Sequence, residues 1–363
     1  MPSGSGDTSH SMLRNLIASL TRRKSAKTLA RRLAVAQAAL VAGEYELAEP
    51  EFLSLAKADP RNGEVWLHAG LCAAQRGDLH LALKHFDNAC ECSPTDHQTL
   101  YRRCETLAAL GRHAEAIAGC HAIIAMAPKF DPGFTLLASL LLPGESYLVV
   151  LPRLHAFLRP ATYLEIGVFR GTSFQHVLPD TRAIGIDPAP QITEPVPRNG
   201  RVVVMTSDEF FATHDVRAEF GGQVVMLGFI DGMHQFEYAL RDFINLERVA
   251  GTDSSILIHD CYPVHPTSAE RVRCTGFWSG DIWRLILILK KYRPDLRVNT
   301  LALWPSGLGL VRGLNPASTV LADAYDAIVA EFMAVDYQVL EADKAGMLNL
   351  FPNDWDKIKT LFV

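Results

Sequence analysis

Two histidines and two aspartates in the C-terminal half of the chain are spaced so that they could transfer a proton or bind a metal ion. Asp231-Gly-Met-His234 and His259-Asp260 each directly follow an apolar run of the kind that forms a buried strand. An imidazole with an ordinary pKa of ~6.5 can accept a proton at cellular pH. Carboxylates are hard oxygen ligands suited to magnesium and manganese, whereas an imidazole suits transition metals better. These residues are therefore candidates for a base and for metal ligands.

Two of these residues also have a purely structural interpretation. His234 could satisfy backbone groups in a tight loop, and Asp260 could bond to the turn that follows it. The spacing of His234 from Asp231, directly after a predicted strand, favours a catalytic role for the imidazole. For Asp260 both interpretations stay open.

A second group of residues lies upstream and indicates a bound nucleoside. The first predicted strand runs into a turn with two glycines, Gly167 and Gly171, which let a ligand approach the backbone. The pattern is Gly-x-x-x-Gly rather than Gly-x-Gly-x-x-Gly, which argues against a dinucleotide phosphate cradle. About twenty residues further on, the next strand ends at Asp187, where a carboxylate suits the two hydroxyls of a ribose.

A parallel sheet would bring these residues together, because ligands bind beyond the carboxyl ends of its strands. From about residue 144, short β-branched runs alternate with amphipathic stretches, which predicts a mostly parallel sheet covered by helices on both faces. The predicted strands are 162–167, 183–187, 202–205, 224–230 and 255–259, followed by an antiparallel pair at 297–303 and 308–312. The predicted helices are 148–158, one from about 173, 237–249 and 281–292.

The region from about Glu145 to Leu314 resembles the class I S-adenosylmethionine-dependent methyltransferases. Within that class it is similar to the small O-methyltransferases related to catechol and macrolide-sugar methyltransferases. Four segments carry the likeness: 164–173, 185–188, 229–238 and 256–260. The resemblance implies a doubly wound, mostly parallel, seven-stranded Rossmann-like domain with an antiparallel closing strand, over residues 143–363. It also implies O-methylation of a small-molecule or glycan hydroxyl.

The same resemblance implies a set of cofactor-binding residues for S-adenosylmethionine. The loop from Gly167 to Gly171 and Glu165 would hold the methionine part, Asp187 would take the ribose hydroxyls, and the two residues after the third strand would edge the adenine. Those last two could equally begin a helix. The full set is Glu165, Gly167, Gly171, Ser173, which would meet the carboxylate, Asp187, Ser207 and Asp208.

For catalysis, the resemblance implies that His234 acts as general base beside Asp231. Metal-dependent relatives bind a divalent cation at these two strand ends, which makes Asp231, Asp260 and His259 the candidate ligands. Those relatives usually carry a carboxylate where this chain has His259. Whether magnesium or another divalent cation binds is therefore an open question at the level of sequence.

The first third of the chain repeats with a period of 34 residues, the interval between Gly43, Gly77 and Gly111. Two further sets keep the interval: Ala48, Ala82 and Ala116, and Pro60, Pro94 and Pro128. A glycine fits the turn of a helical hairpin, a small alanine lets helices approach, and a proline ends the second helix. The pattern resembles the tetratricopeptide repeat. It predicts a solenoid over residues 29–142, with three repeats and a capping helix.

A solenoid of this kind carries no chemistry of its own. Its concave surface could bind a protein partner or a peptide, or it could serve self-association. Ahead of it, residues 1–28 form a basic segment that we expect to be partly disordered. That segment could contact an anionic partner, or its charges could simply face solvent.

The composition excludes several classes of protein. Hydrophobic residues make up 48% and charged residues 21% of the 363, which is ordinary globular usage. The net charge of −5 provides no overall basic surface for nucleic acid, and no apolar run reaches the ~18 residues that span a bilayer. No secretory signal is visible, and the seven cysteines include no Cys-x-x-Cys pair. We therefore expect a cytoplasmic protein with reduced thiols.

Two alternatives to a methyltransferase stay open. The chain could be a scaffold whose repeats bind partners while a degenerate methyltransferase fold no longer catalyses. It could also be a hydroxylase on the same fold, because a fold does not fix the chemistry.

Overall fold

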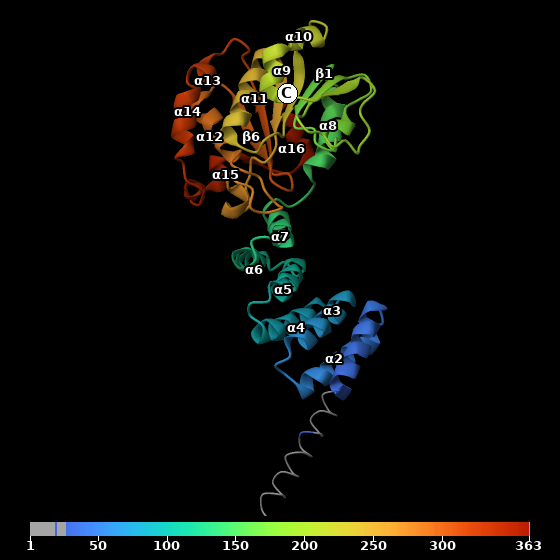
Figure 1. The fold of residues 1–363 in the computed structure, drawn as a ribbon. Coiled ribbons are helices and arrows are strands. Elements are labelled where there is room, and N and C mark those ends of the chain that lie inside the picture. The colour runs from blue at the N-terminus through green and yellow to red at the C-terminus, as the bar shows by residue number, and fades with distance from the viewer. Residues whose placement is uncertain (1–18, 20–26, 363) are drawn as a thin grey trace, which may run out of the picture. The chain divides into compact units, whose positions relative to one another are not determined.

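The computed structural model describes residue 19 and residues 27–362, and the chain divides into two compact units, Met1–Ala127 and Pro128–Val363 (Figure 1). The basic segment predicted over residues 1–28 lies outside the described residues, apart from residues 19, 27 and 28.

The first unit consists of helices joined by tight turns. Residues 27–41 are helical, and the helices that follow are α2 (Tyr45–Ala58), α3 (Gly63–Gln75), α4 (Leu79–Cys92), α5 (His97–Ala109) and α6 (His113–Met126). Gly43, Gly77 and Gly111 each take a positive φ, between +74° and +82°, which favours glycine. The repeating glycines therefore lie in the turns, as the 34-residue period predicts.

Close helix contacts in this unit depend on small side chains. Ala48, Ala82 and Ala116 are completely buried. At Gly70 of α3, an added Cβ would lie 2.5 Å from the ring of Phe86 on α4, so only glycine allows this contact. The resemblance to a tetratricopeptide repeat solenoid is thereby confirmed at the level of the fold.

The second unit begins with two helices, α7 (Asp131–Leu141) and α8 (Tyr147–Leu158). The predicted capping helix at 134–142 corresponds to α7, which clusters with the second unit rather than with the repeats. The boundary of the repeat domain at residue 142 stays a prediction.

A mixed sheet forms the centre of the second unit (Figure 1). Its order is β3-β2-β1-β4-β5-β7-β6-β8, and the first five strands are parallel to one another. The strands are β1 (Thr162–Ile166), β2 (Arg182–Ile186), β3 (Gly200–Val203), β4 (Val225–Ile230), β5 (Ala250–Ile258), β6 (Arg297–Leu301), β7 (Leu308–Arg312) and β8 (Leu350–Phe351). The predicted antiparallel pair is therefore present as β6 and β7.

The prediction of a seven-stranded sheet is wrong, because the sheet has eight strands. The additional strand, β8, has only two residues and pairs in parallel with β6 at the sheet edge. It arises from the C-terminal region, where a two-residue strand has no periodicity of its own.

Apolar side chains alternate between the two faces of the sheet, as strand geometry requires. Leu164 and Ile166 of β1 face one cluster, and Tyr163 faces the other. The first cluster includes side chains from α9 (Ser207–Thr213), α10 (Val216–Glu219), α11 (Phe236–Val249), α12 (Trp283–Tyr292), α13 (Val320–Asp323) and α14 (Tyr325–Met333). The second includes side chains from α8 and α16 (Trp355–Thr360). No helix in residues 19 and 27–362 combines the length and apolar character needed to cross a membrane.

The helix predicted from about Ser173 is wrong. Only a single 3₁₀ turn, η1 (Phe174–His176), follows β1. Val177 is already extended, and Pro179 disfavours a helical conformation at the residue before it. The chain therefore passes from β1 to β2 without an α-helix between them.

Candidate active site

The candidate site lies where β1, β4 and β5 end, and backbone hydrogen bonds just beyond the strands hold it together. The N–H of Asp231 donates to the carbonyl of Ile166 at 2.8 Å, and the N–H of His259 donates to the carbonyl of Ile230 at 2.9 Å. The first residue after each of β4 and β5 is thus fixed to the end of its neighbour. The two predicted loops, 231–234 and 259–260, are consequently side by side.

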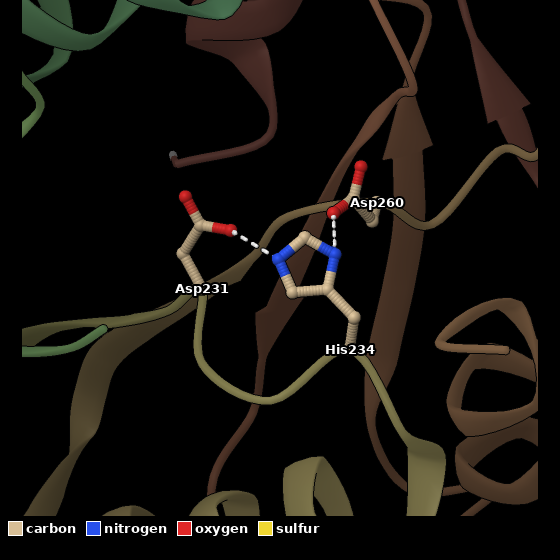
Figure 2. Close-up of side chains that lie close together, drawn as sticks. All are labelled: Asp231, His234 and Asp260. Atoms are coloured by element: carbon tan, nitrogen blue, oxygen red, sulfur yellow. Dashed lines mark ion pairs between the residues drawn. The ribbon is translucent and has the colours of Figure 1, made fainter. Parts of the chain in front are cut away.

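Asp231, His234 and Asp260 point toward one another (Figure 2). His234 Nδ1 lies 2.8 Å from Asp260 Oδ2, and His234 Nε2 lies 3.8 Å from Asp231 Oδ1. His234 and Asp260 have φ values of +56° and +62°, a region that non-glycine residues rarely adopt. Such conformations cluster at functional sites, where the surrounding structure holds them.

His259 completes the group from the first position after β5. Its Nδ1 lies 3.1 Å from Asp231 Oδ1 and 3.3 Å from Asp260 Oδ2. The ring packs against Tyr147, with ring centroids 4.3 Å apart. The structure therefore brings together all four side chains that the sequence assigns to catalysis or metal binding.

The charges of these four groups stabilise one another. Burial alone would raise the pKa of Asp260, but the His259 and His234 imidazoles outweigh it and hold that pKa well below its usual range. Burial likewise opposes the charged form of both histidines, yet the Asp260 and Asp231 carboxylates raise the pKa of His234 and of His259 above the ordinary imidazole value. Asp260 is thus buried between two imidazoles, whereas Asp231, His234 and His259 are partly exposed.

The glycine loop after β1 touches the Asp231 loop directly. Gly167 has a φ of +91°, and an added Cβ there would lie 2.0 Å from the carbonyl oxygen of Asp231. Gly171 also has a positive φ, +84°, but the nearest atom to an added Cβ is 3.6 Å away. Gly167 is therefore required by a backbone contact, whereas Gly171 is required only by its conformation.

Glu165 lies beneath this loop and is fully buried. Its carboxyl group accepts hydrogen bonds from Ser173 Oγ at 2.5 Å and from Tyr163 Oη at 2.6 Å. Burial raises the pKa of Glu165 to about 8, although both hydroxyl donors favour the ionised form. Glu165 and Ser173, both predicted to bind the cofactor, thus bond to each other and anchor the end of the loop.

Asp187 holds the loop from the neighbouring strand β2. Its Oδ2 accepts from the N–H of Phe169 at 2.7 Å, and its Oδ1 accepts from the N–H of Ala189 at 2.8 Å. Each carboxylate oxygen has a second lone pair, so Asp187 can still accept a hydrogen bond from a ligand hydroxyl.

Ser207 and Asp208 open helix α9, after β3. The Asp208 carboxylate pairs with Arg241 of α11, with an Oδ2–Nη2 distance of 2.7 Å. The Ser207 side chain bonds to Asp242 and lowers its pKa against the effect of burial. Their predicted contact with adenine stays a prediction.

A pocket lies beneath the loop that carries His234. Its lining residues are Ile230, Asp231, Gly232, Met233, His234, Ala239, Asp242, Ile258, His259, Asp260 and Ile282. Gly167 and Asp187 do not line it; they lie at the same sheet edge, after β1 and β2. The structure thus groups the catalytic and metal-binding candidates in one pocket, and the lining of that pocket includes none of the predicted cofactor residues.

Asp242 is a pocket residue that sequence reasoning missed. It is buried on α11, and its Oδ1 has no hydrogen-bond partner among the residues that the structure describes. Burial raises the pKa of Asp242 to about 7. It lies within a helical stretch with no local motif, so no signal in the sequence distinguishes it from a surface aspartate.

The loop between β5 and α12 covers His234. The Trp278 ring stacks on the His234 imidazole with centroids 5.0 Å apart and an angle of 9° between the planes. The indole N–H of Trp278 donates to the carbonyl of Glu270 at 2.6 Å, within the same loop. Trp278 therefore limits access to one face of the candidate base.

Helix α7 anchors this covering loop. Asp131 Oδ1 accepts from the N–H of Phe277 at 3.0 Å, and the Phe134 and Phe277 rings stack with centroids 5.8 Å apart. At Gly276 an added Cβ would collide with the Asp131 carboxylate. The residue that covers His234 thus directly follows two residues held by α7.

Two family models match the chain. Residues 33–97 match the tetratricopeptide repeat, and residues 164–261 match the methyltransferase domain. The chain contains a tetratricopeptide repeat region and a methyltransferase domain. The methyltransferase match begins inside β1 and ends just after His259 and Asp260, so it contains all four grouped side chains.

Relatives and solved structures are similar over parts of the chain. The mouse Superkiller complex protein 3 is 32% identical over 93 residues, which is 26% of this chain and 6% of that protein. The type III secretion chaperone SycD of Yersinia enterocolitica, solved with a peptide of the translocator YopD, is 24% identical, with a TM-score of 0.30 and coverage of 32% of this chain and 90% of that one. MamA from Desulfovibrio magneticus RS-1 is 22% identical, with a TM-score of 0.30 and coverage of 31% and 63%.

Replacing Gly167 with alanine is expected to destabilise the second unit more than replacing Gly222. The two φ values, +91° and +85°, are alike, so both variants carry a similar backbone strain of about 1–2 kcal/mol. Only at Gly167 would the new Cβ also collide with the Asp231 backbone, because nothing lies within 4 Å of it at Gly222. Urea denaturation followed by tryptophan fluorescence measures the difference. Equal losses in the two variants would contradict the close contact between the loops.

Glu165→Gln is expected to flatten the pH dependence of stability. The pKa of Glu165 is raised by burial to about 8 in the folded chain, against about 4.3 in an unfolded one. Between these values the folded state keeps a proton that the unfolded state has lost, so the wild-type free energy of unfolding falls as pH rises. Glutamine has no such proton.

Urea unfolding at about pH 5, 6.5 and 8 tests this, because the stability of Glu165→Gln relative to wild type should increase toward alkaline pH. A constant difference across the series would mean that Glu165 is already ionised in the folded state.

Removing the anchor on α7 is expected to release the covering loop. Asp131→Ala or Phe134→Ala should speed tryptic cleavage after Arg273 by at least about threefold, because a loop with fewer tertiary contacts opens more often. Ser139→Ala, on the exposed side of α7, is the matched control and should leave cleavage unchanged. Unchanged cleavage in both anchor variants would show that α7 does not hold the loop.

Proposed function

We propose that the second unit is an S-adenosylmethionine-dependent methyltransferase that methylates a hydroxyl group of a small molecule or glycan. One observation carries the proposal: the Gly167 loop and the Asp231–His234 loop touch at the ends of β1 and β4, and the partly exposed His234 imidazole there lies 2.8 Å from the buried Asp260 carboxylate. The match of residues 164–261 to the methyltransferase domain covers this arrangement.

The residues around the glycine loop fit a nucleoside cofactor with a charged tail. Gly167 lets the loop after β1 pass directly against the Asp231 backbone, Gly171 adds no side chain to that loop, and the Asp187 oxygens retain lone pairs for ribose hydroxyls. Ser173 and Glu165 would shape the end that holds the methionine part, and Ser207 and Asp208 would edge the adenine. S-adenosylmethionine, when bound, supplies an electrophilic methyl group on its sulfonium.

His234 is placed to remove the proton of the acceptor hydroxyl. Its Nδ1 faces Asp260 Oδ2 at 2.8 Å, which favours a proton on Nδ1 and leaves the lone pair on Nε2. Asp231, whose Oδ1 is 3.8 Å from Nε2, would stabilise the imidazolium that forms. The acceptor proton would go to His234 Nε2, and the bound cofactor would supply the methyl group to the acceptor oxygen. Positioning of the two reactants supplies most of the acceleration.

The repeat region is proposed to bind a protein partner or a second copy of the chain. Stacked helical hairpins create an extended concave surface that suits a peptide or a protein segment. That surface would bring the methyltransferase domain to its substrate or into an assembly.

Replacing His234 with alanine is expected to lower kcat by about 10²–10⁴-fold, the usual contribution of a general base. The affinity for S-adenosylhomocysteine should change by less than about twofold, because the imidazole acts on the acceptor. Transfer of a labelled methyl group to a fractionated metabolite and glycan extract gives the activity, and titration calorimetry gives the affinity. His113→Ala, an exposed histidine of the repeat region, is the control.

Two outcomes would contradict this account at different points. Unchanged turnover in His234→Ala would remove the base assignment while leaving the methyltransferase proposal intact. Absence of S-adenosylhomocysteine binding to the wild-type chain would remove the proposal itself.

A further inference from the structure

The two carboxylates at the strand ends are already bridged by a side chain of the protein. Asp231 and Asp260 are the oxygen ligands that a divalent cation would use at this site. His259 Nδ1 lies 3.1 Å from Asp231 Oδ1 and 3.3 Å from Asp260 Oδ2, so one imidazole nitrogen contacts both. Asp260 Oδ2 is in addition the atom that faces His234 Nδ1 at 2.8 Å.

The donor set fits a cation poorly for this reason. Donor atoms of Asp231, His234 and Asp260 do lie within 4.8 Å of one another. A bound ion needs ligand lone pairs directed at it from about 2.0–2.6 Å, but His259 Nδ1 already hydrogen-bonds to Asp231 Oδ1 and lies 3.3 Å from Asp260 Oδ2. A cation could enter only if the His259 ring moved away.

The surroundings of His259 oppose that movement. The side chain is 11% exposed, and its backbone N–H is bonded to Ile230. The Tyr147 ring lies 4.3 Å away at 45°, and the Phe229 ring lies 6.5 Å away at 77°. The imidazole is therefore mostly buried and packs against two aromatic rings.

The position of the proton on His259 follows from its two nitrogens. Nε2 is buried and has no hydrogen-bond partner among the described residues, so an N–H there would be an unsatisfied donor. Nδ1 faces two carboxylate oxygens and gains from carrying the proton. In either charge state of the ring, an Nδ1–H is available to bridge Asp231 and Asp260.

We infer that His259 takes the place of a divalent cation between Asp231 and Asp260, and that the site works without a metal. The inference rests on the proposed methyl transfer for its consequence in catalysis, but not for its consequence in metal binding. His259 is then a positioning residue. It fixes both carboxylates, and Asp260 in turn orients His234.

Metal binding by the full chain tests this directly. Calorimetric titration of the wild type with Mg²⁺ and with Mn²⁺ should give no binding heat. His259→Asp should bind Mn²⁺ at least about tenfold more tightly than wild type, because a third carboxylate oxygen replaces the bridging N–H. His113→Asp adds the same charge at an exposed position in the repeat region and should gain nothing.

Activity provides the second measurement. The wild-type rate of labelled methyl transfer should change by less than about twofold in EDTA. The rate of His259→Asp should be about tenfold or more higher with added metal than in EDTA. His259→Asn keeps an N–H donor, so it should stay metal-independent and retain more activity than His259→Ala.

Several results would overturn the inference. Binding of Mn²⁺ or Mg²⁺ to the wild type, or a loss of about tenfold in EDTA that added metal restores, would place a metal at this site. Failure of His259→Asp to gain metal affinity would contradict the idea that His259 fills a cation position. If wild type transfers no methyl group at all, the proposed function fails, while the binding heats still decide the question of the metal.

Discussion

Backbone hydrogen bonding beyond the strand ends is the constraint on which the candidate site depends. Asp231 and His259 each donate one further N–H to the last carbonyl of the neighbouring strand. This extends the parallel pairing of β1, β4 and β5 by one residue and fixes the position of the first residue of each loop. The close approach of Gly167 to the Asp231 carbonyl follows from the same register. A shift of either strand by one residue would turn these side chains toward the opposite face.

The buried Asp260 carboxylate and the partly exposed Asp231 carboxylate are tolerated at this edge because each contacts an imidazole. Burying an unpaired carboxylate is costly, and removing one partner of a buried pair leaves the other uncompensated. Asp260 contacts both histidines, and Asp231 contacts His259. The positive φ of His234 and of Asp260 shows that the backbone also adapts to this arrangement. Local strain and buried charge thus occur at the same place, as is common where a protein performs chemistry.

Features with a period or a fixed order along the sequence were predictable. The 34-residue interval predicts the helical turns at Gly43, Gly77 and Gly111, and alternating strands and helices predict that Asp231 and His259 end neighbouring strands. Features that depend on contacts between residues distant in the sequence were not predictable. The two-residue strand β8 has no pattern, and Asp131 reaches the loop at Phe277 only through the tertiary fold. The stacking of Trp278 on His234 and the burial of Asp242 likewise depend on the tertiary fold.

The helix predicted after Ser173 shows a different limit. The residues are compatible with a helix, but the turn ends at Val177 because Pro179 follows closely. The local helix propensity after Ser173 was therefore overridden by Pro179 in this short connection. Glu165 and Ser173, two of the predicted cofactor-binding residues, are nevertheless held together by their own hydrogen bond.

Hydrogen–deuterium exchange with and without S-adenosylhomocysteine tests the central claim most directly. If the ends of β1, β2 and β4 form the nucleoside site, amides in segments 167–173, 187–189 and 231–234 should become slower to exchange, while those of α2 to α6 stay the same. Protection confined to other segments, or none at all, would contradict the account.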